Sequence, residues 1–235
     1  MNLLQHALWL KNRDQIELWD DFVWYLSPHV WTNLAADAGV TAFAISDAHA
    51  GVISGATGAT DNNEIAIKST AEVFKFQADK PFVCEARIQY SEANTDDANV
   101  AFGLADAIGA NLLVDDGAGP KTSYSGCLIY KVDGGTKWNA HSSKSTTQTA
   151  TASLTVAGGS AYQVLRMEGR PVDGTNYEIV FFVDEQILRD ANNRPIKHTV
   201  AYASATEMQI GCYIKAGSAN SETLLVDYIG LAFKR

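Results

Sequence analysis

Carboxylates are the most abundant reactive side chains of this chain, which holds 27 Asp and Glu residues against 18 Lys and Arg. A retaining glycosidase needs two carboxyl groups roughly 5–5.5 Å apart, a spacing that residues i and i+2 of one strand provide. No two acidic residues of this sequence are separated by a single residue. Adjacent pairs such as Asp20-Asp21 and Asp184-Glu185 would point to opposite faces of a strand. The sequence therefore lacks the simple glycosidase arrangement.

The motifs of other catalytic mechanisms are absent as well. The sequence has no G-x-S-x-G elbow, no H-E-x-x-H pair and no Gly-rich phosphate loop ending in Lys-Ser or Lys-Thr. Its five histidines are scattered, and only Asp47 and His49 would share a face if they lay on a strand. Such a pair is more typical of a structural hydrogen bond than of a base and its orienting partner. We therefore predict no enzymatic activity and no catalytic or cofactor-binding residue.

Three loops are rich in the hard oxygen ligands that calcium prefers, namely 61–64, 94–97 and 115–116. None of them has the spacing of an EF-hand, and clusters of this kind are usually solvated turns. We predict no metal-binding residue, with a structural calcium ion as the alternative.

The net charge of −9 excludes two classes of partner. Binding to nucleic acid requires clustered Lys and Arg that neutralise phosphates, and docking on an anionic membrane requires a basic surface. The three cysteines, Cys84, Cys127 and Cys212, form no C-x-x-C pair and lie in apolar runs. Buried free thiols are typical of proteins made in a reducing cytoplasm. The apolar N-terminus lacks the basic residues and the cleavage site of a signal peptide.

The chain reads as a series of short strands. From Phe82 to Tyr90, apolar residues alternate with polar ones, which indicates a strand with one buried face. Similar runs, separated by turn formers such as Asp133-Gly134-Gly135, indicate an all-β sandwich. The segment 142–151, rich in Ser and Thr, is interpreted as a strand edge or a loop. The predicted strands are 42–46, 51–54, 64–69, 73–76, 81–91, 98–106, 112–114, 127–132, 137–142, 150–156, 162–168, 177–183, 186–190, 208–215 and 224–233.

The N-terminal segment differs from the remainder of the chain. We predict an arm or short helix over 1–18 and one sandwich domain over 19–235, because no break is long enough to be a linker. The apolar residues of the segment have two interpretations: packing on their own domain, or anchoring the chain to a neighbouring subunit. In the second interpretation the partner-binding residues are Leu3, Leu4, Leu8, Trp9, Leu10 and Trp19.

Several strings resemble the concanavalin-like and laminin-G-like jelly rolls. The sequence IVFFVDEQIL at 179–188 is similar to their F-x-V-D-G-x-L hairpin, with Glu185 where that family usually has Gly. The segments 19–22 and 224–231 are similar to their first and last strands. The resemblance implies a jelly-roll β-sandwich of two antiparallel sheets with a short N-terminal arm, and it carries over no functional residue because this fold hosts many functions.

The sequence is also similar to structural proteins of tailed bacteriophages, in the segments 61–64, 102–106, 115–120, 215–220 and 222–224. This resemblance implies a virion component, most simply a capsid decoration (cement) protein made in the host cytoplasm. Its expected partners are the major capsid protein and further copies of itself, as a homo-oligomer on the capsid surface.

The alternative function is that of a carbohydrate-binding module, as in a phage fibre, a tail or a lectin, which recognises a surface glycan. Trp138, Tyr124 and Tyr130 are then the aromatic residues that would stack on sugar rings, although such residues more often pack between strands. A hydrolase is the third and weakest hypothesis. A glycan array, or activity on polysaccharides that depends on one carboxylate, separates these functions.

Overall fold

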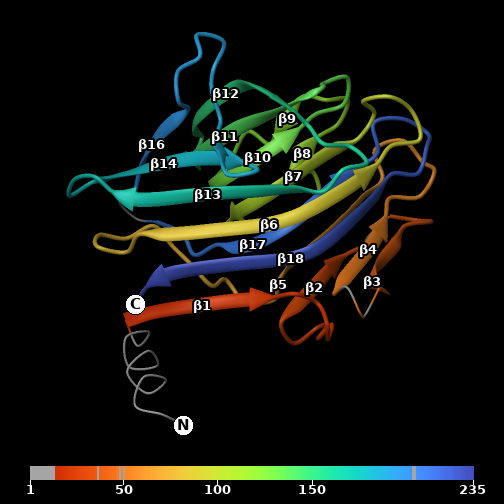
Figure 1. The fold of residues 1–235 in the computed structure, drawn as a ribbon, viewed down its shortest axis with the longest axis horizontal. Helices are drawn as coiled ribbons and strands as arrows, with labels where there is room; N and C mark the ends of the chain where they lie inside the picture. The colour runs from red at the N-terminus through yellow and green to blue at the C-terminus, as the bar shows by residue number, and fades with distance from the viewer. Residues whose placement is uncertain (1–13, 36, 48, 50, 203–204) are drawn as a thin grey trace.

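The computed structural model describes residues 14–35, 37–47, 49, 51–202 and 205–235. These residues form β-strands joined by turns and loops, arranged in two large antiparallel sheets (Figure 1). The described residues include no helix of the length and apolar character that a membrane crossing requires. The predicted all-β sandwich of two antiparallel sheets is therefore confirmed.

The first sheet has nine strands in the order β15-β14-β13-β6-β18-β4-β3, with β1 paired to β18 and β16 paired to β14. Their bounds are β1 (Gln15–Asp20), β3 (Thr41–Asp47), β4 (Val52–Ala56), β6 (Phe82–Ser91), β13 (Gln163–Pro171), β14 (Asn176–Val183), β15 (Gln186–Ile187), β16 (Lys197–Ala201) and β18 (Thr223–Lys234).

The second sheet has seven strands in the order β12-β11-β10-β7-β17-β5-β2, and a two-stranded ladder joins β8 to β9. Their bounds are β2 (Trp31–Leu34), β5 (Glu64–Ser69), β7 (Asn99–Ala105), β8 (Leu113–Val114), β9 (Gly119–Pro120), β10 (Tyr124–Lys131), β11 (Lys137–Ser145), β12 (Thr147–Val156) and β17 (Gln209–Lys215).

The main core lies between the two sheets, and strand alternation builds it. In β6, Phe82, Cys84, Ala86, Ile88 and Tyr90 are buried while the residues between them are more accessible. Side chains of successive strand residues point to opposite faces, so every second residue of β6 enters the core. All three cysteines are buried and unbonded, as expected from the sequence.

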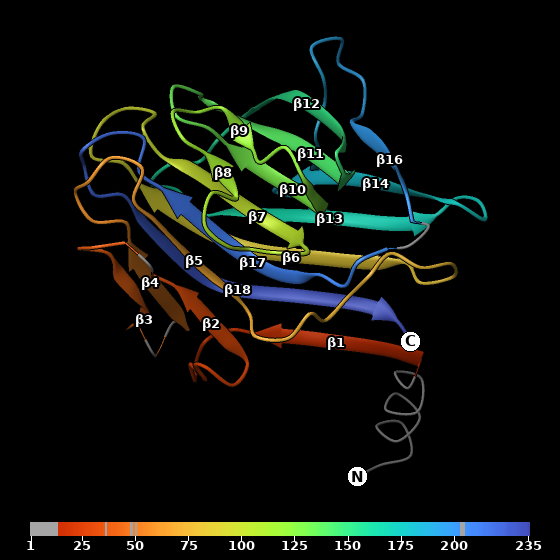
Figure 2. The same cartoon turned by 180° about the vertical axis from the view of Figure 1, so that it is seen from behind.

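The outer face of the seven-stranded sheet carries a second apolar cluster. Ile108, Leu112 and Leu113 pack there with residues of the sheet such as Ala101 and Tyr213. The segment 106–123, with β8 and β9, lies in front of the sheet in Figure 2. Because this segment covers the sheet, β7 and β10 are buried along their whole length.

Most of the predicted strands are confirmed, with three local differences. The segment 73–76 makes only an isolated bridge between Phe74 and Met208. The polar segment 142–151 belongs to two paired strands, β11 and β12. Four strands were not predicted, namely β1, β2, β9 and β16, and most of β1 lies in the segment expected to be an arm or short helix.

The two predicted hairpin turns differ in backbone conformation. Asp133-Gly134-Gly135 joins β10 to β11 as expected, with Gly134 at φ 70°. Between β14 and β15, Asp184 and Glu185 both have positive φ, 49° and 63°. Two consecutive residues of this kind form the type I′ turn that suits a two-residue hairpin. Glu185 therefore adopts the conformation for which Gly is normally preferred.

The boundary expected after residue 18 falls inside a strand. Residues 15–18 form the first part of β1, which pairs with β18 from Gln15–Lys234 to Asp20–Ile229. Leu18 packs against the main core. The predicted anchors Leu3, Leu4, Leu8, Trp9 and Leu10 lie outside the described residues.

Candidate functional site

A shallow trough runs over β18 on the outer face of the nine-stranded sheet. Its shape follows from strand register, because Trp19 of β1, Gly230 of β18 and Glu85 of β6 lie side by side. Two residues further along, Glu17, Ala232 and Val83 form a parallel row, in the same strand order. Small residues on the central strand give the trough its floor, and larger ones on both neighbours give it walls. The trough has a volume of about 290 Å³.

Trp19 forms one wall of the trough and is fixed in place. Its ring stacks on Tyr228 with a centroid distance of 4.7 Å and an interplanar angle of 25°. A Cβ atom at position 230 would lie only 2.4 Å from the Trp19 ring, so Gly230 allows the indole to lie against β18. Trp19 nevertheless remains 59% exposed. Stacking on one side and exposure on the other make it a rigid apolar platform.

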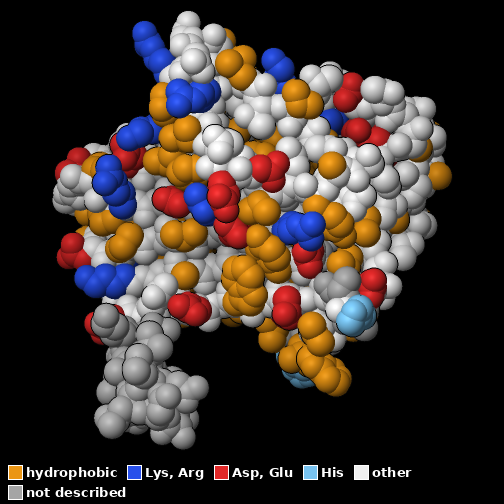
Figure 3. All heavy atoms as spheres, in the orientation of Figure 1, with side chains coloured by type: hydrophobic (Ala, Val, Ile, Leu, Met, Phe, Trp, Pro, Cys, Tyr) orange, Lys and Arg blue, Asp and Glu red, His pale blue; other side chains and the backbone are white. Residues whose placement is uncertain are grey.

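Glu85 stands on the opposite wall and is held by its neighbours. The Tyr228 hydroxyl donates a 2.6 Å hydrogen bond to Glu85 Oε1, and Arg166 Nη1 lies 3.9 Å from Glu85 Oε2. Glu17 supplies a second, exposed carboxylate beside Trp19. Hydrophobic, acidic and basic side chains are interspersed over this face (Figure 3). The trough thus offers an aromatic surface flanked by hydrogen-bond acceptors.

A second exposed feature is the loop between β1 and β2, which contains an apolar group that the sequence analysis did not single out. Val23, Trp24 and Leu26 are 43%, 78% and 53% exposed. The loop is anchored below them, where Asp20 accepts hydrogen bonds from Phe22 N and from Trp31 Nε1. Figure 3 shows a hydrophobic projection at this place. Exposed contiguous apolar side chains are typical of contact surfaces.

The aromatic residues expected to stack on sugars do not reach the surface. Trp138 and Tyr124 are 1% exposed and Tyr130 is 9% exposed. Trp138 lies in the core between the sheets, and the two tyrosines belong to the cluster beneath the segment 106–123. All three residues therefore pack inside the protein, as aromatic residues of strands more often do, and the alternative in which they stack on sugar rings is not supported. For the two tyrosines, the strand pattern did not reveal that the outer face of their sheet is covered.

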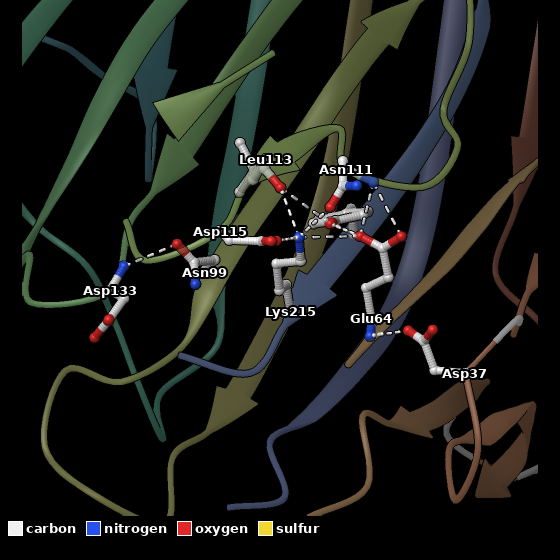
Figure 4. Close-up of polar contacts among 9 residues, drawn as sticks. Asp37, Glu64, Asn99, Asn111, Leu113, Asp115, Asp133 and Lys215 are labelled. Carbon is white, nitrogen blue, oxygen red and sulfur yellow. Dashed lines mark hydrogen bonds and ion pairs between the residues drawn. The ribbon is translucent and has the colours of Figure 1, made fainter. Parts of the chain in front are cut away.

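Buried charges define a third site, at one end of the seven-stranded sheet. Figure 4 shows Lys215 of β17 surrounded by oxygen atoms from β5 and from the loop after β7. Its Nζ lies 2.6 Å from Asn111 Oδ1, 3.1 Å from the Leu113 carbonyl oxygen and 2.5 Å from Asp115 Oδ1. Glu64 Oε2 is 3.5 Å away. The Lys215 side chain is fully buried, whereas Asp115 is 51% exposed.

Glu64 is itself fixed by several donors. Asn111 N donates to both of its carboxylate oxygens, at 3.0 and 2.9 Å, and the Tyr213 hydroxyl donates to Oε2. Asp37 accepts a hydrogen bond from Glu64 N. Burial, together with the Glu64 charge, raises the pKa of Tyr213 well above its ordinary value, so this phenol remains a donor.

A parallel arrangement lies on the other side of β7. Lys131 of β10 is 1% exposed and donates to Glu92 Oε1 at 2.7 Å and to the Asp96 and Ala98 carbonyls at 2.9 Å each. Lys131 and Lys215 pair with neighbouring residues of β7, Val100 and Asn99. Two buried ammonium groups therefore hold two acidic loops at the same end of the sheet.

Glu222 has a carboxyl pKa that would suit acid–base chemistry near neutral pH, but its side chain is not accessible to a substrate. Burial, with the Glu92 and Asp97 charges, raises the pKa of Glu222 to about 7. Its side chain is fully buried, and it accepts a hydrogen bond from Ala93 N. Of the suspected pair, Asp47 accepts a hydrogen bond from the backbone N of His49, which is a turn contact.

The described residues contain no group of three or more His, Cys, Asp or Glu side chains placed to hold a metal ion. Two of the three loops considered for calcium do contribute to the Lys215 site, through Glu64 and Asp115. The carboxylates of these two residues lie around the Lys215 ammonium group.

Comparison with known proteins identifies the fold. No family model and no curated protein matches the sequence. Among solved structures, the carbohydrate recognition domain of Emp47p is similar, with a TM-score of 0.57 at 12% identity over 93% of this chain and 94% of that one. An endo-1,3-beta-glucanase from Streptomyces sioyaensis gives a TM-score of 0.59 at 15% identity, over 94% and 97%. Peanut lectin gives 0.52 at 10% identity, over 94% and 97%.

These likenesses extend over nearly the whole chain. At such low identity they establish the architecture, a lectin-like and concanavalin-like jelly-roll sandwich, and the expected resemblance to that fold is confirmed. The fold by itself assigns no function, which has to be argued from the residues of the site.

Proposed function

We propose that this chain is a non-enzymatic carbohydrate-binding domain that recognises a surface glycan. The observation that carries the proposal is the trough over β18, where an exposed, rigidly stacked Trp19 faces Glu85 across the small residues Gly230 and Ala232. Similar folds occur in carbohydrate recognition domains and lectins, which supports this choice among the functions open to a binding domain.

A pyranose ring suits this site because it has an apolar face of C–H groups and a rim of hydroxyl groups. The apolar face packs on an aromatic ring, and the hydroxyls donate to carboxylate oxygens. Glu17 and Glu85 are acceptors at the two walls, and Tyr228 and Arg166 limit the movement of Glu85. Two carboxylates disfavour a sialic or uronic acid, since like charges brought together cost free energy. A neutral sugar is therefore the expected ligand.

Replacing Trp19 by alanine tests this proposal. A glycan array with the unaltered chain first identifies the ligand, and its affinity is then measured by titration calorimetry. We expect Trp19→Ala to weaken binding at least about thirtyfold, the effect of an aromatic residue that carries about 2 kcal/mol of binding energy.

Trp24→Ala is the matched control, because Trp24 is exposed but lies outside the trough. This variant should bind the glycan as the unaltered chain does. An array without binders would remove the proposed function. Equal affinity of Trp19→Ala and the unaltered chain would exclude the trough as the site.

The second candidate function is capsid decoration, favoured by the exposed Val23, Trp24 and Leu26 beside the start of the sandwich. In this proposal the chain forms a homo-oligomer on the virion surface, after synthesis in the host cytoplasm, and binds the major capsid protein through this loop, Trp19 and the apolar residues of 1–13. Light scattering of the chain, alone and mixed with empty capsids, measures both associations. Trp24→Ala and removal of 1–13 should each reduce capsid binding; a monomer that ignores capsids contradicts the proposal.

A further inference from the structure

The oxygen atoms around Lys215 are of the types that also occur in calcium sites. They comprise the Glu64 and Asp115 carboxylates, the Asn111 side-chain oxygen and the Leu113 carbonyl. Carboxylate, amide and backbone carbonyl oxygens are the ligands that Ca²⁺ takes. We propose that this is a cation cage filled by the chain's own ammonium group, so that the loop after β7 is held by a covalently attached cation in place of a metal ion.

The charges in the cage require a cation. Glu64 is 5% exposed at its side chain and contributes one negative charge, to which Asp115 adds a second at the rim. An ionised carboxylate removed from water is costly unless it is paired and hydrogen-bonded. Lys215 lies between the two, and it donates to neutral oxygens as well. One fixed cation therefore compensates the buried Glu64 carboxylate, while the half-exposed Asp115 carboxylate is also solvated.

The cage also explains how the loop is held on the sheet. The loop supplies three of the oxygen atoms that accept hydrogen bonds from Lys215, and Asn111 N also donates to Glu64 of β5. Ile108, Leu112 and Leu113 of the same loop pack on the outer face of the sheet. Lys215 occupies the end of β17, so its ammonium cannot dissociate or be removed by a chelator. This loop should accordingly need no divalent cation.

The test compares the unaltered chain with Lys215→Ala, which empties the cage but leaves its oxygen atoms in place. The melting temperature of each protein is measured in EDTA and in increasing CaCl₂, and Tb³⁺ luminescence reports direct binding. The unaltered chain should melt at the same temperature in all conditions. Lys215→Ala should melt lower in EDTA, and its melting temperature should rise with the logarithm of the Ca²⁺ concentration, as for a ligand that binds the folded state.

Lys131→Ala is the matched control. It also removes a buried ammonium, but its three oxygen partners include only the single carboxylate of Glu92. That variant should lose stability and show no response to Ca²⁺. A folded Lys215→Ala that ignores Ca²⁺ would overturn the proposal, as would an equal response from Lys131→Ala.

A second variant covers the case in which Lys215→Ala fails to fold in EDTA. The triple variant K215M/E64Q/D115N removes the charges together, and replacing a buried ionic group by neutral side chains is usually tolerated. If Lys215→Ala folds only when Ca²⁺ is added and the triple variant folds without it, the proposal holds. If the triple variant folds and Lys215→Ala folds under neither condition, the proposal fails. None of these readouts depends on glycan binding.

Discussion

Lowering the pH from 7 to 4 is expected to reduce the free energy of unfolding by about 6 kcal/mol through His141 and His198 together. A difference of one between the folded and unfolded pKa corresponds to about 1.36 kcal/mol. Burial lowers the pKa of both imidazoles from 6.5 to about 4. The His141 charge adds to the effect at His198. Both side chains are almost completely buried, at 3% and 2% exposed.

The surroundings of both histidines favour the neutral form of the imidazole over the charged form. His141 shares a 2.6 Å hydrogen bond with the Tyr124 hydroxyl, and His198 bonds Ser142 and Thr151 at 3.0 Å each. The unfolded chain takes up protons below pH 6.5, whereas the folded chain does so only near pH 4. The stabilising contribution is therefore complete above pH 6.5 and is lost as the pH falls towards 4.

Urea denaturation at pH 7, 5.5 and 4 measures this contribution. His198→Gln should lose about 3 kcal/mol less than the unaltered chain between pH 7 and pH 4, because one of the two titrating groups is gone. The control is His29→Gln, which removes an exposed imidazole. Equal slopes for all three proteins would show that His198 does not titrate abnormally.

The sequence predicts those strands in which apolar and polar residues alternate strongly, or which form a continuous apolar run. The segment 82–90 alternates over nine positions, and β6 spans it. In β16, only His198 and Val200 point inward, so the strand has no apolar signal of its own. The short β2 has a single fully buried residue, Trp31, followed by Thr32, Asn33 and the half-buried Leu34. Their strand character comes from pairing with β14 and β5, which local sequence does not encode.

The candidate site depends still more on long-range register. Glu17 and Trp19, Val83 and Glu85, and Gly230 and Ala232 are each spaced by two residues, so each pair shares a face of its strand. The spacing alone does not show that the three strands are neighbours. β1 and β18 come from opposite ends of the chain and are brought together only by the fold. Trp19 was singled out as a partner-binding residue, whereas its position in a trough was not predictable.

The two buried lysines illustrate a second limit. Lys131 and Lys215 stand at the ends of apolar strands, where a charged residue ordinarily marks the passage into solvent. Here, acidic loops fold over both of them and complete their hydrogen bonds. A usable signal was the coincidence of a strand-terminal lysine with acidic loops elsewhere in the chain, such as 92–97 and 115–116.

Replacing Glu222 by glutamine is expected to stabilise the domain by about 3 kcal/mol at pH 8, from the pKa shift of a fully buried carboxyl group. The carboxyl pKa is raised from 4.5 to about 7, mainly by burial and further by the Glu92 charge. Oε1 is buried without a hydrogen-bond partner, so the ionised form is poorly compensated. A glutamine keeps the acceptor for Ala93 N and carries no charge.

The sign of this effect is opposite to that of the histidines. A raised pKa means that the folded state favours the protonated acid, so the contribution is present below pH 4.5 and is lost as the pH rises through 7. Glu222→Gln should therefore resemble the unaltered chain near pH 4.5 and exceed it in stability at pH 8. Denaturation at these two pH values measures the gain, and the control is Glu207→Gln, at a side chain that is 59% exposed. If the free energies of unfolding of Glu222→Gln and the unaltered chain differ by the same amount at pH 4.5 and at pH 8, Glu222 ionises normally in the folded protein.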